Sequence, residues 1–449
     1  PGALGRQCVP VLSDVPDRRE ATGRSKDVEV VEVTQLSEVV GPEQVLTDDG
    51  VRQGYETDWT GRFTGTCEAV VRPGTTEEVA AVLRWASEND RAVHVQGGNT
   101  GLVGGSVPAT GDRPVIILST TRLRTPMEVV GRSAIVGAGV ALGDVQRLAA
   151  QHGLVYGVDL AARDSATIGG TVATNAGGIR VCKYGMTRMQ VEGLEAVLPD
   201  GSVVRRMNGL AKDNTGFDLA GLLTGSEGTL GVITAVRVRL HDPAEESVVA
   251  VWGVDSLAEA LDHARAQGSG LQAAEVVDRR AWAEAGGPDL GDHPWTLLLE
   301  SDMETAELPD EALVATEGPD RARLWHFRES QSEVAQQMGV KQKVDVAVPL
   351  DRLDEFTSAV FEAHPCTIFG HVADGSLHVE LFDTGEDDVL ANVVEFGGAV
   401  SAEHGVGRAK TTAVVDDRGP EAMAAMRAIK NALDPHAVLN PGVLFSAGN

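Results

Sequence analysis

Three glycine-rich segments between residues 97 and 231 restrict the possible folds of the chain more than any other feature. They are GGNTGLVGG at 97–105, SATIGGTVATNAGG at 165–178 and TGSEGTLG at 224–231. Glycine leaves room for backbone N–H groups to converge on a phosphate oxygen, and the Ser, Thr and Asn residues between the glycines add donors. One such segment is usually a turn. Three of them in one region predict a binding site for a dinucleotide or a diphosphate.

A fourth glycine pattern, in IVGAGVALGDVQRLAAQHG at 135–153, is close to the fingerprint of nicotinamide-dinucleotide domains. Gly137, Gly139 and Gly143 are spaced GxGxxxG, whereas the fingerprint requires GxGxxG. Asp159 lies twenty residues after Gly139, but no regular strand–helix–strand unit with an acidic ribose ligand follows. The pattern therefore predicts a tight strand-to-helix turn and argues against a nicotinamide cofactor.

Hydrophobic patterning divides the chain into two regions of different character. From about residue 68, strand-like segments such as AVHVQGG, PVIILS and SAIVGAG alternate with helical ones, and Thr75 with Glu78 forms a capping box at a helix start. EGLEAVLPDGSVVRR predicts a hairpin that turns at Asp200 and Gly201. Beyond about residue 247, helices alternate with short strands, which predicts a second α+β domain built on an antiparallel sheet.

Two histidines flank an Asp-Gly pair in FGHVADGSLHVEL at 369–381. If Asp374 and Gly375 form a two-residue hairpin turn, His371 faces His378 across the strands, with Cβ atoms ~4.5–5.5 Å apart. Two imidazoles placed in this way can share a metal ion. A hairpin with two surface histidines is the alternative.

Charge and cysteine content exclude several functional classes. The sequence contains 38 basic and 66 acidic residues, and its net charge of −28 disfavours nucleic acid and anionic membrane surfaces as partners. Cys8, Cys67, Cys182 and Cys366 are scattered without a CxxC pair, which indicates reduced thiols and a cytoplasmic protein. The sequence has neither the apolar core of a signal peptide near its start nor a run of 18 apolar residues, so no transmembrane segment is expected.

Several motifs together resemble one enzyme family. They are VQGGNTGLVGGSVP, DSATIGGTVATNAGG, KYGMTRMQVEGLEAVLPDGSVV and GSEGTLGVITAV, followed by LWHFRES, FGHVADGSLHVE, SAEHGVGRAK and LDPHAVLNPG. In this order they resemble the FAD-linked oxidases, whose PCMH-type flavin domain is shared with vanillyl-alcohol oxidase. The nearest branch is that of the D-2-hydroxyglutarate and D-lactate dehydrogenases. The likeness covers roughly residues 40–445.

The resemblance implies an α+β fold with four parts. Residues 1–38 would form an N-terminal arm, and 39–245 an FAD-binding domain of two α+β subdomains. Residues 246–400 would form an α+β cap or substrate domain with an antiparallel sheet. Residues 401–449 would return to the FAD domain and the active site.

The same resemblance assigns residues to a non-covalent FAD. No histidine lies in the first glycine segment, and His94 is on the preceding strand, so a covalent histidyl flavin is not expected. The first segment would hold the pyrophosphate, the second would line the ribityl chain and isoalloxazine, and two further residues would lie near the adenine and the ring system. The implied residues are, in chain order, Gly97, Gly98, Asn99, Thr100, Gly101, Leu102, Ser165, Ile168, Gly169, Thr174, Asn175, Gly177, Gly178, Ile233 and Asn440.

In the dehydrogenase branch, a divalent metal and a histidine base act on the substrate. The matching metal ligands are His371, His378 and Glu403, with zinc as the expected ion and manganese or iron as alternatives. The matching base is His404, because imidazole has a suitable pKa near neutrality. The resemblance also implies that His404 contacts the substrate, and that the residues holding its distal carboxylate are Arg328, Ser332 and Lys343. Arg328 and Ser332 are spaced i and i+4, which predicts one shared helix face.

The chain departs from the branch at three positions of the histidine hairpin. Ala373 and Ser376 replace the usual Gly and Asn, and Glu380 replaces an Asn. Strand alternation directs Glu380 to the same face as His378, where a carboxylate repels an anionic substrate unless it joins the metal or pairs with a base. The identity of the substrate therefore stays open.

The expected function is oxidation of a D-2-hydroxy acid, such as D-2-hydroxyglutarate, a related dicarboxylate or D-lactate, to the 2-oxo acid by hydride transfer to flavin N5. The electron acceptor would be an electron-transfer flavoprotein, a quinone or a cytochrome, and a homodimer is one expected assembly. The alternatives are a flavin oxidase or a redox-neutral flavoenzyme of the same fold that acts without the metal. A metallohydrolase with a nucleotide substrate is a further alternative.

Overall fold

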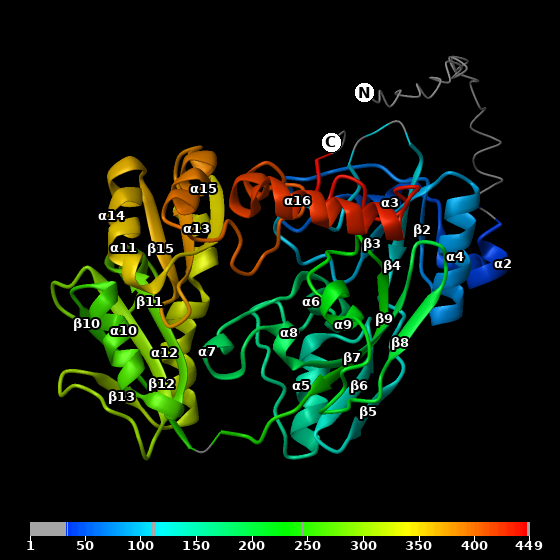
Figure 1. Ribbon diagram of the computed structural model, residues 1–449. Helices are drawn as coiled ribbons and strands as arrows, with labels where there is room; N and C mark the ends of the chain where they lie inside the picture. Colours follow the sequence, from blue (N-terminus) through cyan, green and yellow to red (C-terminus); the bar gives the residue numbers. More distant parts are fainter. Residues whose placement is uncertain (1–32, 34, 110, 112, 245, 447–449) are drawn as a thin grey trace, which may run out of the picture.

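The computed structural model describes residue 33 and residues 35–109, 111, 113–244 and 246–446. Of the predicted N-terminal arm, residues 1–32 and 34 lie outside the described residues, as does Cys8. The described part forms two α+β bodies that lie side by side, and the final helix α16 lies beside the first of them (Figure 1). No helix within the described ranges combines the length and the apolar character needed to cross a bilayer.

The first subdomain is built on a four-stranded sheet in the order β1-β2-β4-β3. Strands β2, β4 and β3 are parallel, and β1 is antiparallel to β2. Helix α4 begins after Thr75, whose hydroxyl accepts a hydrogen bond from Glu78 N at 3.1 Å, while the Glu78 carboxylate accepts from Gly74 N. The element bounds are β1 Val45–Leu46, β2 Ala69–Val71, β3 Ala92–Gln96, β4 Val115–Ser119, α2 Ser37–Val40, α3 Asp49–Glu56 and α4 Thr76–Glu88.

The second subdomain is a five-stranded antiparallel sheet in the order β5-β6-β9-β7-β8. The predicted turn at 135–153 is confirmed, because β6 ends at Gly137 and α5 begins at Leu142. A Cβ atom at Gly139 would lie 2.2 Å from Thr120 O, so only glycine allows this close approach. The bounds are β5 Met127–Val130, β6 Ser133–Gly137, β7 Val191–Val197, β8 Val203–Arg206, β9 Val232–Arg239, α5 Leu142–Gln151, α6 Ile168–Thr174, α7 Val181–Tyr184, α8 Thr187–Gln190 and α9 Leu219–Leu223.

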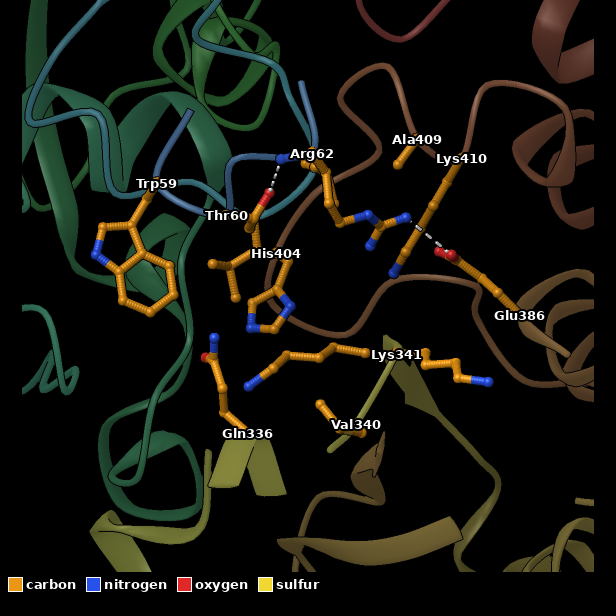
Figure 2. Close-up of a pocket in the computed structure, with 13 residues that line it drawn as sticks. Trp59, Thr60, Arg62, Gln336, Val340, Lys341, Glu386, His404, Ala409 and Lys410 are labelled. Carbon is orange, nitrogen blue, oxygen red and sulfur yellow. Dashed lines mark hydrogen bonds and ion pairs between the residues drawn. The ribbon is translucent and has the colours of Figure 1, made fainter. Parts of the chain in front are cut away.

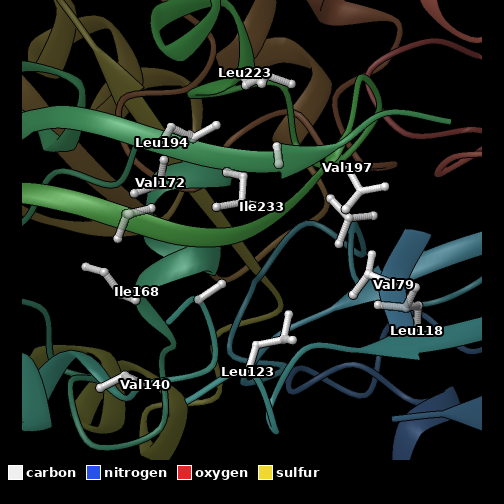
Figure 3. Packing of buried hydrophobic residues seen from close by; sticks show 14 of the residues in the cluster. Val79, Leu118, Leu123, Val140, Ile168, Val172, Leu194, Val197, Leu223 and Ile233 are labelled. Carbon is white, nitrogen blue, oxygen red and sulfur yellow. The ribbon is translucent and has the colours of Figure 1, made fainter. Parts of the chain in front are cut away.

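One hydrophobic core joins the two subdomains. Val79 and Leu118 come from the first sheet and its helix, whereas Ile168, Leu194 and Ile233 come from the second sheet and α6 (Figure 3). All five side chains are at most 5% exposed. Burial of this kind stabilises by roughly 1.5–3 kcal/mol per large aliphatic side chain. The two glycine segments that begin at 97 and 165 are therefore held on a rigid body.

The second domain is a seven-stranded sheet, antiparallel throughout, in the order β13-β10-β12-β11-β15-β16-β14. One face packs a core against α10, α14 and α15, and part of the other packs against α11 and α12. The bounds are β10 Ser247–Val254, β11 Leu271–Asp278, β12 Trp295–Asp302, β13 Leu313–Ala315, β14 Gln342–Ala347, β15 Cys366–His371, β16 Ser376–Leu381, α10 Leu257–Ala266, α11 Arg279–Glu284, α12 Gly318–Glu329, α13 Gln331–Gln337, α14 Leu353–Ala363 and α15 Glu386–Glu395. The predicted α+β fold with an antiparallel sheet in the second domain is confirmed.

The C-terminal segment leaves the second domain and returns to the first. Helix α16 (Ala413–Leu433) bends at Gly419, whose φ is 78°, just before Pro420. After the helix, Val93 N donates to Val438 O at 2.7 Å, and Asn440 N donates to Val93 O at 2.9 Å. The tail therefore runs along β3, immediately before the first glycine segment.

Candidate active site

The hairpin that carries the two histidines has a longer loop than the sequence predicts. His371 pairs with Ser376, and His378 pairs with Phe369, so residues 372–375 form a four-residue loop. The predicted two-residue turn is therefore wrong. The reason is that Val372 N donates to Ala274 O at 3.0 Å and its side chain is fully buried, which removes Val372 from the ladder. The observed pairing differs from the predicted pairing by two residues. Because side chains alternate between the faces with a period of two, His371 and His378 still point to the same face of the sheet.

The structure brings the three predicted metal ligands together. The distance from His371 Nε2 to Glu403 Oε1 is 3.5 Å, and that from His378 Nε2 to Glu403 Oε2 is 3.9 Å. One ligand atom from each residue lies within 4.8 Å of the others. The His371 and His378 side chains are only 7% and 13% exposed, which is not the exposure of surface histidines. Two imidazoles and one carboxylate are a suitable donor set for zinc or a neighbouring first-row metal.

The protonation states of these groups differ strongly. Although burial opposes the shift, Glu275 and Glu403 raise the pKa of His371 well above its usual value. Burial lowers the pKa of His378 to about 3, so this imidazole is neutral at pH 7 and free to bind a cation. Burial also opposes ionisation of Glu403, but His371 holds its pKa at about 2. The set thus contains an ionised carboxylate and at least one neutral imidazole.

A buried carboxylate behind His371 fixes the orientation of its ring. His371 Nδ1 lies 2.7 Å from Glu275 Oε1, while Glu275 Oε2 accepts from Arg328 Nε at 2.7 Å. A carboxylate bonded to the second ring nitrogen is the usual support for a metal-binding histidine. Arg328 is 6% exposed, and its guanidinium lies over the Phe369 ring at 4.7 Å.

Arg328 and Ser332 do not share one helix face, and this prediction is wrong. Helix α12 ends at Glu329, and α13 begins at Gln331. Arg328 points inward to Glu275, whereas Ser332 is exposed and its carbonyl accepts from Lys343 Nζ at 3.0 Å.

His404 is held in place by a carboxylate that sequence reasoning missed. Asp345, on β14 opposite His378, accepts hydrogen bonds from Glu403 N at 3.1 Å and His404 N at 3.0 Å. The same oxygen lies 3.7 Å from His404 Nδ1 and 3.7 Å from Lys410 Nζ. The sequence contains a signal for Asp345, which is the acid within the apolar run KVDVAV. A charge at a buried strand position needs a partner.

A cavity of about 320 Å³ opens beside His404 (Figure 2). Its wall carries four cationic side chains and one acidic side chain, in a chain whose net charge is −28. Cationic groups in a cavity wall can receive a small anion even in an acidic protein. The lining residues are Trp59, Thr60, Arg62, Leu102, Val103, Gln336, Val340, Lys341, Lys343, Glu386, His404, Ala409 and Lys410.

The cavity contains one predicted substrate ligand besides His404, namely Lys343. Its Nζ atom is 3.6 Å from Glu380 Oε2. Glu380 is 2% exposed and lies two residues from His378 on β16, so it shares the face of His378 as expected. Burial raises the pKa of Glu380 to about 7, against the opposite effect of Lys343.

The first two glycine segments pack backbone to backbone and leave an open cradle. A Cβ atom at Gly98 would lie 1.9 Å from Ser165 O, and one at Gly97 would lie 2.4 Å from Thr167 Oγ1. Within the described part of the chain, none of the backbone N–H groups of residues 98–102 donates to another group. Asn99 stands at φ 53°, with its side chain bonded to Thr57 O and Ser106 Oγ. A cradle of unpaired amides fits the diphosphate of FAD.

The second glycine segment also reaches the metal ligands. Gly178 N donates to Glu403 Oε1, and a Cβ atom at Gly177 would lie 2.8 Å from the same oxygen. Thr174 and Asn175 end helix α6, while Ser165 is exposed before it. The predicted cofactor site and the predicted metal site are therefore adjacent.

The third glycine segment is a structural junction. Gly225 N and Glu227 N donate to carbonyls of α6 at 3.0 and 2.8 Å. The Glu227 carboxylate accepts from Val406 N and Gly407 N at 2.8 and 2.7 Å, close to His404 in sequence. Asn440 Nδ2 donates to Glu227 O at 2.6 Å, whereas the Ile233 side chain is part of the hydrophobic core.

The chain is similar to known FAD-linked proteins over most of its length. The family model for the FAD binding domain matches residues 67–206, and that for the C-terminal domain of FAD linked oxidases matches residues 243–444. D-2-hydroxyglutarate dehydrogenase of Xanthomonas citri pv. viticola is 35% identical, over 92% of this chain and 96% of that protein. The mitochondrial D-2-hydroxyglutarate dehydrogenase of Bos taurus is 36% identical, over 90% of this chain and 81% of that protein.

Among solved structures, p-cresol methylhydroxylase has a TM-score of 0.73 at 16% identity, over 95% of this chain and 98% of that one. At this identity the likeness shows the fold, which confirms the PCMH-type architecture expected from the motifs. The sequence matches and the fold lead to one conclusion. The chain belongs to the FAD-linked oxidase family.

Proposed function

We propose that the protein is an FAD- and divalent-metal-dependent dehydrogenase that oxidises a D-2-hydroxy acid to the 2-oxo acid. The observation that carries this proposal is the position of Glu403. Its carboxylate accepts a hydrogen bond from Gly178 of the second glycine segment and lies beside His371 and His378. The next residue, His404, lines the cation-rich cavity. The proposed cofactor site and metal site would therefore meet at Glu403, and the proposed base is the next residue, His404.

Each group has a role that its chemistry supports. FAD, which the first two glycine segments would hold, would supply a hydride acceptor for the hydrogen on the substrate Cα. His371, His378 and Glu403 would hold a divalent metal, zinc being expected, which supplies Lewis acidity toward the hydroxyl and carboxylate. His404 takes the hydroxyl proton, because a neutral imidazole is an effective base near neutral pH. Lys343 lines the cavity in which we place the substrate.

Arg328 and Ser332, the other two predicted substrate ligands, contact other groups of the protein. Arg328 is bonded to Glu275, so we assign it to the support of His371. Ser332 is exposed, and its carbonyl orients Lys343. The electron acceptor would be an electron-transfer flavoprotein, a quinone or a cytochrome.

The relatives named D-2-hydroxyglutarate dehydrogenase support this reaction class. A flavin oxidase or a redox-neutral enzyme of the same fold has no need for a buried set of two imidazoles and a carboxylate beside the base. A metallohydrolase has no need for an FAD-binding domain, which the family match supports.

The test is anaerobic flavin bleaching with a panel of D- and L-2-hydroxy acids, including lactate, 2-hydroxybutyrate, 2-hydroxyisocaproate and 2-hydroxyglutarate. We expect loss of the oxidised flavin absorbance with at least one D-acid and formation of one 2-oxo acid per flavin. Flavin that stays oxidised with every member of the panel would refute the proposal. Oxidation of hydroxy acids by metal-free protein at the full rate would favour the metal-independent oxidase.

A further inference from the structure

Glu380 is a buried carboxylate on the active-site face of the second domain, and the proposed reaction does not use it. It lies opposite Lys343 on β14 and Thr367 on β15. His378 stands two residues earlier on the same strand, so the two side chains leave one face of the sheet about 7 Å apart. Within the described residues, Glu380 Oε2 accepts no hydrogen bond, and Thr367 Oγ1 has no partner either. Polar atoms left unpaired in a buried wall constrain what can be placed beside them.

Carboxylates compensate most of the positive charge around the cavity. Three of its four cations have a carboxylate oxygen within 4.0 Å, which leaves the solvent-exposed Lys341 without an ion pair in the described part of the chain. A fifth cation, Arg328, is bonded to Glu275. The three compensated pairs are Arg62–Glu386 at 3.0 Å, Lys343–Glu380 at 3.6 Å and Lys410–Asp345 at 3.7 Å.

The remaining wall of the cavity is largely uncharged. Leu102, Val103, Val340 and Ala409 present apolar surface, and Trp59 stands at the rim with 65% exposure. Such a wall suits an apolar or neutral substrate side chain, because a charge placed against it, away from the solvent-exposed Lys341, loses hydration without gaining a partner. The metal ligands and His404 are then left to receive the single α-carboxylate and the hydroxyl.

We propose that Glu380 restricts the enzyme to 2-hydroxy acids whose side chain carries no second negative charge. This inference rests on the dehydrogenase function proposed above and narrows its substrate class to monocarboxylates. A second carboxylate next to Lys343 would share one ammonium group with Glu380, and like charges at close range in a poorly hydrated wall repel strongly. Discrimination of this kind works by repelling the wrong substrate, and it leaves binding of the right one unchanged.

Two substrates of the same shape test the role of charge. D-2-hydroxyglutarate and its 5-amide differ only in the terminal group, and both are mixed anaerobically with the flavin-loaded protein at pH 8.5. We expect the second-order rate constant for flavin reduction to be at least about tenfold higher for the amide. In Glu380→Gln this preference should fall by at least about tenfold, mainly because the dicarboxylate reacts faster.

Two further variants separate charge from packing. Glu380→Asp keeps the carboxylate and should keep the wild-type preference, whereas the exposed Glu362→Gln removes a distant surface carboxylate and should change nothing. The comparison of the two substrates on the wild type needs no variant, so it stands even if Glu380→Gln fails to fold. A wild type that prefers the dicarboxylate, or a folded Glu380→Gln with an unchanged ratio, overturns the inference while the dehydrogenase function stands. If no D-2-hydroxy acid of the wider panel reduces the flavin, both proposals fail together.

Discussion

Glu403 and His404 are neighbours in sequence that serve two different sites. The Glu403 side chain lies between the second glycine segment and the paired imidazoles, whereas the His404 ring lines the cavity. Their backbone amides both donate to one Asp345 oxygen. A single buried carboxylate therefore positions a proposed metal ligand and the proposed base at once, which explains why an acid occupies a buried position on β14.

The proposed base is tested directly by His404→Asn. Asparagine preserves a polar group but cannot take a proton, so we expect the rate constant for flavin reduction to fall by about 10²–10⁴-fold. The FAD content should stay unchanged, because His404 is not among the predicted cofactor ligands. The exposed His152→Asn serves as the control. Stopped-flow reduction at wild-type speed in His404→Asn would remove the assignment.

Asp345 should stabilise the folded protein as well as position Glu403 and His404. Although burial opposes ionisation, His404 and Lys410 hold the pKa of Asp345 below its usual range. Asp345→Asn leaves the buried Lys410 without a carboxylate, so we expect the unfolding free energy at pH 7 to fall by about 3 kcal/mol. Because the folded-state pKa is depressed, this stabilisation is fully present at neutral pH and is lost progressively as the pH falls from about 4 toward the lowered folded-state pKa.

Urea unfolding at pH 7 and at pH 3.5 measures this difference, with the exposed Asp310→Asn as the matched control. A variant as stable as the wild type at pH 7 would show that Asp345 contributes nothing net to the fold.

At the scale of elements, the sequence predicts strands and helices well where local patterning decides them. The capping box at Thr75, the hairpin at Asp200 and the strand-to-helix turn after Gly137 all follow from short-range rules, and the structure has each of them. The histidine hairpin differs because Val372 is bonded to β11, about a hundred residues away in the chain. Turn length depends here on a long-range contact that no local pattern contains.

The same limit explains the missed residues of the site. Asp345, Lys410 and Arg62 come from three separate segments, and only tertiary packing places Lys410 and Arg62 in one cavity wall with Asp345 3.7 Å from Lys410 Nζ. The break between α12 and α13 at Ser330 likewise changes which way Ser332 points, although the spacing from Arg328 fits a continuous helix. The glycine cradle was predictable because residue type alone marks a close backbone approach.

Two glycines of the first segment provide a matched test of that close approach. A methyl group at Gly98 would collide with Ser165 O, whereas one at Gly101 would meet nothing within 4 Å. We expect Gly98→Ala to push the two segments apart, with a loss of about 2 kcal/mol in unfolding free energy and weaker FAD binding. Gly101→Ala should fold normally. Thermal unfolding and FAD titration of the apoprotein check both variants, and equal stability of the two would contradict the proposed packing.

At the scale of the whole molecule, the site lies where the two domains meet. Ion pairs cross this boundary away from the metal ligands, with Arg180 Nη2 3.0 Å from Glu300 Oε2 and Arg163 Nη2 3.3 Å from Glu329 Oε1. Glu300 is buried and also accepts from Trp325 Nε1 at 2.9 Å. These contacts connect the second domain to the first.

The proposed metal should reinforce this boundary, because its ligands come from different parts of the molecule. His371 and His378 belong to the second domain, whereas Glu403 lies in the C-terminal segment and is bonded to Gly178 of the first. A ligand that binds only the folded arrangement stabilises it in proportion to the logarithm of its concentration over Kd. Removal of the metal by a chelator should therefore lower the Tm of the intact protein and abolish flavin reduction by the substrate.

The measurement combines metal analysis, thermal unfolding and anaerobic reduction before and after dialysis against a chelator. Addition of zinc or manganese should restore both the Tm and the rate, while FAD content remains constant throughout. His378→Asn is the matched variant, since it lacks one ligand and should gain little from added metal. Protein that loses its metal yet keeps the same Tm and reduces its flavin at the same rate would show that the two histidines and Glu403 have another role.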